Sequence, residues 1–205
     1  MNKKYLIIGN PVKHSLSPKI HNYWFNENNI DAIYEKKELF DHELKDLVEN
    51  IRNDKILGAN VTVPFKQKII PFIDSLSELS KKTNSVNTIY KKNNLIIGDN
   101  TDIFGFVKSI QHQSIDLKNK TALILGGGGV VPSIINGLND LMVKKTFLMN
   151  RTFENIIKLK EKYPKIELLK WGEIVEFDII INATSVGLKT DDDLNLNLNS
   201  FKKRS

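Results

Sequence analysis

The residues best suited to bind a ligand are a run of glycines in the second half of the chain. Residues 126–129 are all glycine, follow the apolar segment Thr121–Leu125, and precede an apolar stretch that continues through Leu141. A glycine turn between a strand and a helix lets backbone N–H groups, here those of Gly126 and Gly128, approach a pyrophosphate at the helix N-terminus. We therefore predict a dinucleotide site. A glycine-rich loop without a ligand is the alternative.

The tip of the next strand carries an arginine instead of an acid. Dinucleotide folds that bind NAD place Asp or Glu there for the ribose 2′-hydroxyl, whereas this chain has Asn150-Arg151-Thr152. Because a guanidinium is a permanently charged planar fork that matches a phosphate, Arg151 favours NADP over NAD. Thr152 can cap the following helix and donate its hydroxyl to the 2′-phosphate. The alternative is a surface arginine beside a plain helix cap.

Polar loops interrupt the first hundred residues where strands or helices are expected to meet. They are Asn10–Ser17, Asn60–Lys66, Asn87-Thr88 and Asp99–Asp102. Such loops are where α/β folds place ligand sites. Ser15 and Ser17 precede a predicted helix, so their hydroxyls and the helix N–H groups can receive a carboxylate. The alternative for Ser17 is a simple N-cap.

A lysine at a predicted helix start is the candidate proton donor. Lys66 follows Pro64-Phe65, and the positive end of a helix macrodipole is an unfavourable place for a cation that only meets solvent. A lysine in that position can serve as a general acid. Since the chain has 27 lysines, a surface role for Lys66 is the alternative.

The elements that must position these loops alternate between strands and helices. In the first segment we predict strands at Lys4–Ile8, Ile33–Leu39, Leu57–Val63, Val86–Tyr90 and Leu95–Ile97, and helices at Asp41–Arg52 and from Ser17-Pro18, with Ser17 as N-cap. In the second we predict strands at Thr121–Leu125, Thr146–Met149, Ile166–Leu169 and Phe177–Ile181, and helices through Leu141 and at Phe153–Tyr163. This pattern predicts an α/β fold with mainly parallel sheets, and the second segment is half of a doubly wound nucleotide-binding fold. From Lys189 onward, including the Leu–Asn alternation, we see little core-building signal.

Composition excludes several classes of function. The 205 residues carry a formal charge of +6, but 27 of the 30 basic residues are lysines scattered singly, so no nucleic-acid partner is expected. No apolar run approaches the roughly 20 residues that span a bilayer, and the first residues lack a signal-peptide pattern, so we expect a cytoplasmic protein without a membrane partner. With no cysteine and no His/Asp/Glu cluster of metal spacing, no metal site is expected.

The polar loops resemble the shikimate dehydrogenase family. The matching segments are Gly9-Asn10-Pro11, Ser15-Leu16-Ser17-Pro18, residues 58–66, Val86-Asn87-Thr88, residues 98–102, Asn150-Arg151-Thr152 and Asn182-Ala183-Thr184-Ser185-Val186-Gly187. They occur in order across roughly residues 5–190. The resemblance implies an NADP-dependent reductase that interconverts 3-dehydroshikimate and shikimate in aromatic amino-acid (chorismate) biosynthesis. It also implies a substrate-binding α/β domain, residues 1–102, and a Rossmann-like NADP-binding domain, residues 103–205.

The resemblance further implies a role for each candidate residue. Ser15 and Ser17 hold the substrate carboxylate, and Asn60, Thr62, Asn87 and Asp102 contact the ring hydroxyls. Lys66 and Asp102 form the catalytic pair, in which the lysine protonates the nascent alkoxide and the aspartate orients it. Gly126, Gly128 and Gly129 receive the pyrophosphate, and Asn150, Arg151 and Thr152 the 2′-phosphate. The small-molecule substrate is then the main partner, and a homodimer is a further expectation.

Some features depart from the family. Its members continue with more strands of the nucleotide domain, a tyrosine and a Gly-x-x-Met-Leu-x-x-Gln-Ala helix, so we expect an incomplete second domain, an open parallel sheet edge and weak or no activity. Asn155 stands where many members have a second basic residue, which leaves Arg151 alone or helped by Lys158. Two alternatives remain: a non-catalytic remnant that binds a hydroxy acid, and an NAD-using quinate/shikimate dehydrogenase, against which Arg151 argues.

Overall fold

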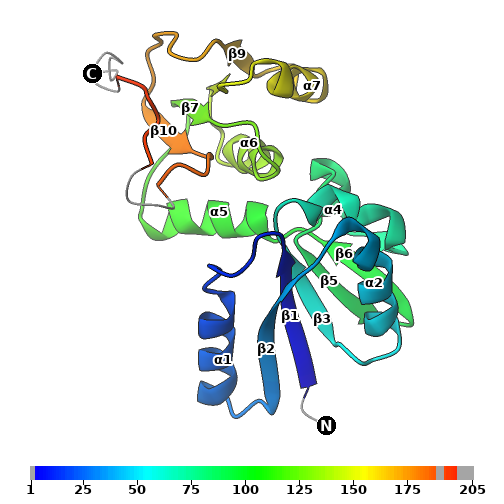
Figure 1. Cartoon of the computed structure of the whole chain (residues 1–205). Coiled ribbons are helices and arrows are strands. Elements are labelled where there is room, and N and C mark those ends of the chain that lie inside the picture. Colours follow the sequence, from blue (N-terminus) through cyan, green and yellow to red (C-terminus); the bar gives the residue numbers. More distant parts are fainter. Residues whose placement is uncertain (1–2, 188–191, 198–205) are drawn as a thin grey trace. The chain divides into compact units, whose positions relative to one another are not determined.

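The computed structural model describes residues 3–187 and 192–197 (Figure 1). The chain divides into two compact units, Met1–Thr101 (unit 1) and Asp102–Ser205 (unit 2). The boundary expected from the sequence, after residue 102, differs from this division by one residue. Each unit is built on its own sheet.

The sheet of unit 1 has six strands in the order β2-β1-β3-β5-β6-β4. They are β1 (Lys3–Gly9), β2 (Ala32–Glu38), β3 (Gly58–Val61), β4 (Ser75–Leu76), β5 (Thr88–Lys92) and β6 (Leu95–Asp99). β1 is parallel to β2 and β3, and β4 is parallel to β6, whereas β5 is antiparallel to β3 and β6. Asn93 and Asn94 both have positive φ, as a type I′ hairpin turn requires, so this turn reverses the chain between β5 and β6, and β5 alone runs against the direction of the other strands.

Helices cover both faces of this sheet, and successive side chains of β1 pack alternately on one face and on the other. Leu6 and Ile8 belong to one apolar cluster with residues of α2 (Leu44–Arg52), which follows the 3₁₀ turn η1 (Asp41–Glu43). Tyr5 and Ile7 belong to a second cluster that includes Phe25 of α1 (Ser17–Glu27). Successive side chains of a strand point to opposite faces, which accounts for the separation. The remaining short elements are α3 (Phe65–Lys68), η2 (Ile70–Phe72) and α4 (Glu78–Thr83).

Helix α1 buries none of its residues. Its apolar side chains Ile20, Tyr23 and Trp24 are 53–57% exposed. The helix predicted from Ser17-Pro18 is present, and these side chains have the i, i+3, i+4 spacing of one helix face, but in the described structure this apolar stripe faces outward.

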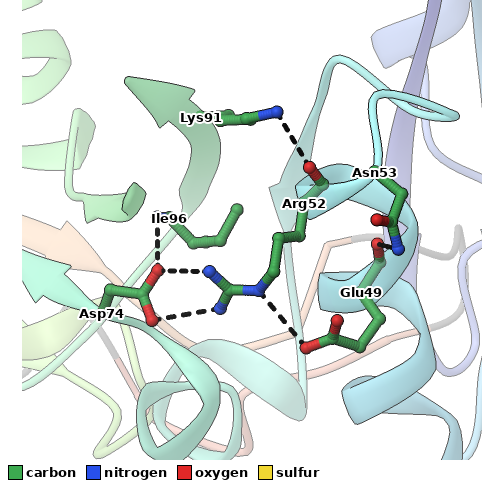
Figure 2. A network of polar contacts seen from close by, with 6 residues as sticks. All are labelled: Glu49, Arg52, Asn53, Asp74, Lys91 and Ile96. Atoms are coloured by element: carbon green, nitrogen blue, oxygen red, sulfur yellow. Dashed lines mark hydrogen bonds and ion pairs between the residues drawn. The ribbon is translucent and has the colours of Figure 1, made fainter. Parts of the chain in front are cut away.

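An ion-pair network joins the end of α2 to two strands of the same sheet (Figure 2). The guanidinium of Arg52 donates to both carboxylate oxygens of Asp74, at 2.8 and 3.0 Å, and its Nε donates to Glu49. Asp74 also accepts the Ile96 N–H at 2.7 Å, and Lys91 Nζ donates to the Arg52 carbonyl at 2.9 Å. Arg52, one of three arginines in the chain, is therefore a structural residue.

Unit 2 has four parallel strands in the order β10-β7-β8-β9. Its elements are α5 (Asp102–His112), β7 (Thr121–Leu125), α6 (Val131–Asp140), β8 (Lys145–Met149), α7 (Glu154–Lys162), β9 (Glu167–Leu169) and β10 (Ile179–Asn182). The predicted β-α-β-α-β series is confirmed. Within the residues that are described, β10 is an edge strand of this sheet. None of the described helices is long and apolar enough to cross a membrane.

Helix α5 was missed by the sequence analysis. Its apolar residues Ile103, Phe106, Val107 and Ile110 have the i, i+3, i+4, i+7 spacing that could have revealed it. It packs closely on α6, because a Cβ at Gly137 would lie 2.6 Å from the Phe106 ring.

One expectation about the end of the chain is wrong. Leu194 and Leu196 pack against the cluster formed by Leu123, Leu125, Phe147, Met149 and Leu169 on one face of the unit 2 sheet. Because the Leu–Asn alternation has a period of two, it places both leucines on one side of an extended segment. Residues 188–191 and 198–205 of that segment lie outside the described structure.

Candidate active site

Two of the predicted loops meet where the parallel strands β1 and β3 end. The Asn10 N–H donates to the Val63 carbonyl at 3.0 Å, and the Thr62 N–H donates to the Ile8 carbonyl at 2.9 Å. Gly9 permits this approach, because a Cβ there would lie 2.5 Å from Cγ2 of Thr62. The loop that carries Ser15 and Ser17 and the segment that carries Asn60, on β3, and Thr62, just after it, are thereby anchored to the same end of the sheet.

The two serines form a hydroxyl pair at the start of α1. Ser15 Oγ donates to Ser17 Oγ at 3.1 Å and accepts the Ser17 N–H at 3.2 Å. The predicted N-cap role of Ser17 is wrong: the helix begins at Ser17, and Leu16 is the N-cap residue without a side-chain cap. The reason is that Ser15 already supplies the acceptor for the Ser17 amide. Two half-buried hydroxyls at a helix N-terminus suit a carboxylate.

Asn60, Asn87 and Thr88 share one hydrogen-bonded network. Asn60 Nδ2 donates to Thr88 Oγ1 at 3.1 Å and to the Asn87 carbonyl at 3.3 Å, and Thr88 Oγ1 donates to Asn87 Oδ1 at 2.9 Å. Asn87 Nδ2 donates to Thr101 Oγ1 at 2.9 Å, while its Oδ1 accepts the Thr101 N–H at 3.0 Å. The structure therefore brings two of the predicted substrate residues together.

Tyr34 is a member of this network that the sequence analysis missed. Its hydroxyl donates to Asn60 Oδ1 at 2.5 Å, and its side chain is buried. Burial raises the pKa of the Tyr34 phenol well above its usual value, so the hydroxyl keeps its proton at any working pH. No sequence motif could have revealed this contact, because Tyr34 and Asn60 lie on strands that are separated by β1.

The predicted catalytic pair lies at two helix starts. Lys66 is the second residue of α3, and its carbonyl accepts the Val86 N–H at 2.8 Å. Asp102 is the first residue of α5 and directly follows Thr101 of the network. Both side chains are half-buried. Lys66 belongs to unit 1 and Asp102 to unit 2, so their pairing stays a prediction.

The glycines of unit 2 have different structural roles. Gly126 has φ +116°, and a Cβ there would lie 2.7 Å from the Ala183 carbonyl, so only glycine fits the position. A Cβ at Gly127, which was not among the predicted site residues, would lie 2.8 Å from Ile156 of α7. Gly128 and Gly129 are exposed, and a Cβ at either position would meet no heavy atom within 4 Å, which leaves room for a ligand against the backbone.

The polar tip after β8 is arranged by Asn150. Its Nδ2 donates to the Thr152 carbonyl at 2.6 Å. Arg151 is exposed and has no ion pair with any described residue, as a side chain that awaits an anion would. The predicted cap at Thr152 is wrong, because α7 has Phe153 as its N-cap residue and no side chain caps the helix. Thr152 contacts the helix start through its carbonyl, which accepts the Asn155 N–H at 3.2 Å.

The Asn182-Ala183-Thr184 segment closes a turn next to the glycines. Asn182 Oδ1 accepts the Thr184 N–H at 3.0 Å and its hydroxyl at 2.7 Å. This turn places the Ala183 carbonyl where Gly126 needs to be glycine. In the described part of the chain, no group of three His, Cys, Asp or Glu residues could hold a metal ion.

A Rossmann-like unit with a glycine turn, preceded in the chain by an α/β unit with hydroxyl and amide side chains, is the arrangement of an enzyme class that uses a nucleotide cofactor on a small polar substrate. Comparison with known proteins specifies the family. The model of the shikimate dehydrogenase substrate binding domain matches residues 7–89, and that of the shikimate/quinate 5-dehydrogenase matches residues 108–190. The chain belongs to the shikimate dehydrogenase family.

Individual relatives agree with this assignment. The shikimate dehydrogenase (NADP(+)) of Pelagibacter ubique is 55% identical over 203 residues, which cover 99% of this chain and 77% of that protein. The crystal structure of the Aquifex aeolicus enzyme superimposes with a TM-score of 0.88 at 38% identity and covers 98% of this chain and 76% of that one. The Thermus thermophilus enzyme, solved with NADP(H) and shikimate, gives a TM-score of 0.82 at 27% identity and covers 91% of this chain and 70% of that one.

Proposed function

We propose that this chain catalyses the NADP-dependent interconversion of 3-dehydroshikimate and shikimate, a step of aromatic amino-acid (chorismate) biosynthesis. The observation that carries the proposal is the 55% identity to an NADP-dependent shikimate dehydrogenase over 99% of the chain. The hydrogen-bonded network of Asn60 and Asn87 supports it, because a polyhydroxylated ring needs fixed amide donors and acceptors.

The substrate is bound at its two polar ends. Ser15 and Ser17 receive the carboxylate at the start of α1, where the hydroxyl pair and the helix N-terminus favour an anion. Asn60, Thr62, Asn87 and Asp102 contact the ring hydroxyls. Asn87 is buried and held by Thr101, so its position changes little when the substrate arrives.

Lys66 and Asp102 handle the proton. In the reduction, Lys66 donates a proton to the carbonyl oxygen as it becomes an alkoxide, and Asp102 orients the lysine and favours its charged form. When bound, NADPH supplies the hydride to the carbonyl carbon. In the reverse direction Lys66 accepts the hydroxyl proton.

The residues of unit 2 fit NADP. The open positions at Gly128 and Gly129 allow the pyrophosphate to approach the backbone at the start of α6, and Gly126 holds the turn. Arg151, exposed and without an ion pair among the described residues, supplies the charge for the 2′-phosphate, with Asn150 and Thr152 as polar neighbours. A cytoplasmic location and assembly as a homodimer complete the proposal.

The test is shikimate-dependent reduction of NADP by the purified chain, followed by the absorbance of the NADPH formed. The Pelagibacter ubique enzyme serves as positive control, Lys66→Ala as the catalytic control and Lys68→Ala as its match, since Lys68 is in an ion pair with Asp41 instead. We expect Lys66→Ala to lower kcat about 10²–10⁴-fold and Lys68→Ala to have little effect. A folded chain that binds shikimate but gives no turnover would favour the non-catalytic remnant, and equal rates with NAD would favour the quinate/shikimate alternative.

A further inference from the structure

Tyr34 connects two elements that the proposed site needs. It lies on β2, and its side chain reaches past β1 to Asn60 on β3, where its hydroxyl donates to Oδ1 at 2.5 Å. Only 3% of Tyr34 is exposed, and it shares an apolar cluster with Ile7 and Val12. The phenol is therefore placed by packing and makes its polar contact with a predicted substrate residue.

Helix α1 holds Tyr34 from the other side. The His21 ring stacks on the Tyr34 ring with centroids 4.1 Å apart and planes 12° apart. The Asn22 carboxamide binds the Tyr34 main chain twice: its Nδ2 donates to the carbonyl at 2.9 Å, and its Oδ1 accepts the N–H at 2.8 Å. Both residues lie within the first two turns of the helix that begins at Ser17, so the serine pair and Tyr34 are attached to one rigid element.

The hydrogen bonds around Asn60 allow its carboxamide only one orientation. Thr88 gives its hydroxyl proton to Asn87 Oδ1, and the Asn87 carbonyl is an acceptor, so both require the NH₂ group of Asn60. Asn60 Oδ1 then faces Tyr34, whose hydroxyl completes the set as donor. Without that hydroxyl, Oδ1 would lose the partner shown here, and only the two hydrogen bonds of the NH₂ group would hold the amide in place.

We propose that Tyr34, held by His21 and Asn22, is a positioning residue that fixes the Asn60 carboxamide for a ring hydroxyl of the substrate. Through α1 it also sets the distance between the serine pair and Asn60, which are the carboxylate end and a hydroxyl end of the site. The proposal rests on the proposed function, in which Asn60 contacts the substrate.

The first experiment compares Tyr34→Phe with Tyr5→Phe. Both remove one hydroxyl from neighbouring strands of unit 1 and keep the ring, but the Tyr5 hydroxyl has no hydrogen bond with the described residues. We expect Tyr34→Phe to raise the KM for shikimate about tenfold, with kcat and the KM for NADP nearly unchanged, and Tyr5→Phe to change none of them. A purely structural tyrosine would instead lower the melting temperature without this separation of KM from kcat.

A double-mutant cycle then tests whether Tyr34 acts through Asn60. In an Asn60→Ala background, Tyr34→Phe should have no further effect on the KM for shikimate, because the group that it positions is absent. A tenfold effect that persists in that background, or an equal effect of Tyr5→Phe, would overturn the proposal.

A measurement without substrate separates this inference from the proposed function. The side-chain NH₂ signals of Asn60 in ¹⁵N-labelled, ligand-free protein should shift in Tyr34→Phe and not in Tyr5→Phe. Unchanged signals would overturn the positioning role. Shifted signals in a protein that fails to bind shikimate would overturn the proposed function and leave the coupling between Tyr34 and Asn60 established.

Discussion

The two units build their candidate binding residues in different ways. In unit 1, Asn60, Asn87 and Thr88 are fixed by hydrogen bonds between side chains, with Tyr34 and Thr101 at the two ends of the network. In unit 2 the corresponding surface is mostly main chain. It consists of one glycine with positive φ and two open glycine positions, and the exposed side chain of Arg151 follows the next strand of the same unit.

This difference follows from what each ligand offers. A hydroxylated ring is recognised by directional donors and acceptors, which must be oriented before binding. A pyrophosphate presents charge and many equivalent oxygens, so N–H groups at a helix start suffice. We therefore expect the loss of polar side chains to be most damaging to the site of unit 1, and the replacement of glycines to be most damaging to the site of unit 2.

The largest effect is expected at the glycine turn. Gly126→Ala introduces a Cβ 2.7 Å from the Ala183 carbonyl at φ +116° and should lower the free energy of unfolding by about 3 kcal/mol. Gly128→Ala has open space and should change it by less than about 0.5 kcal/mol, while it raises the KM for NADP. Urea denaturation of both variants checks the pair. Equal losses of stability would contradict the distinction between the two glycines.

A matched pair of asparagines compares the units directly. Asn87 is buried, and Asn87→Ala removes both the acceptor of the Thr101 N–H and the donor to its hydroxyl, so it should cost about 2 kcal/mol of stability. Asn150→Ala removes one exposed contact with the Thr152 carbonyl and should cost under about 1 kcal/mol. Thermal melts should show the larger loss of stability in Asn87→Ala. A larger loss in Asn150→Ala would contradict the comparison of the two units.

Arg151 is expected to affect the affinity for NADP and not the rate of the reaction. Arg151→Leu should raise the KM for NADP about tenfold and leave the KM for NAD unchanged, because only NADP carries the 2′-phosphate. Arg151→Lys keeps the charge without the planar fork and should fall between wild type and Arg151→Leu. If both cofactors lost affinity equally, Arg151 would have another role.

The smallest effect concerns the pH dependence of unit 1. The hydrogen bonds from Arg52, together with that from the Ile96 N–H, lower the pKa of Asp74 below its usual value. A carboxyl with a lowered folded-state pKa stabilises the fold above its unfolded pKa, about 4, and this contribution disappears as the pH falls through the folded value. Urea denaturation at several pH values should show wild type losing its advantage over Asp74→Asn below about pH 4. A constant difference at all pH values would contradict this.

Much of the fold could be predicted from local patterns. The apolar strand Thr121–Leu125 and the glycines after it identified the first strand and turn of unit 2, because period and turn chemistry act over few residues. The Leu–Asn alternation was misjudged, since its two leucines are recognised as packed only once the sheet face that receives them is known. The caps at Ser17 and Thr152 failed because other groups bond there: the Ser17 N–H donates to Ser15 Oγ, and the Asn155 N–H donates to the Thr152 carbonyl.

The candidate site was predicted unevenly. Motifs identified residues that we propose to contact a ligand, such as Asn60 and Asn87. They could not identify Tyr34 or Gly127, because each acts through a contact with a distant strand or helix. Residues that support a site leave weaker sequence signals than residues that touch the ligand.

The most direct test of this account is to map each ligand separately by NMR chemical-shift perturbation on the ¹⁵N-labelled chain. Shikimate alone should shift the signals of Ser15, Ser17, Asn60 and Asn87, and NADP alone those of Gly126–Gly129 and Asn150–Thr152. Shikimate shifts that gather on unit 2, or NADP shifts that gather on unit 1, would contradict the division of labour between the side chains of one unit and the backbone of the other.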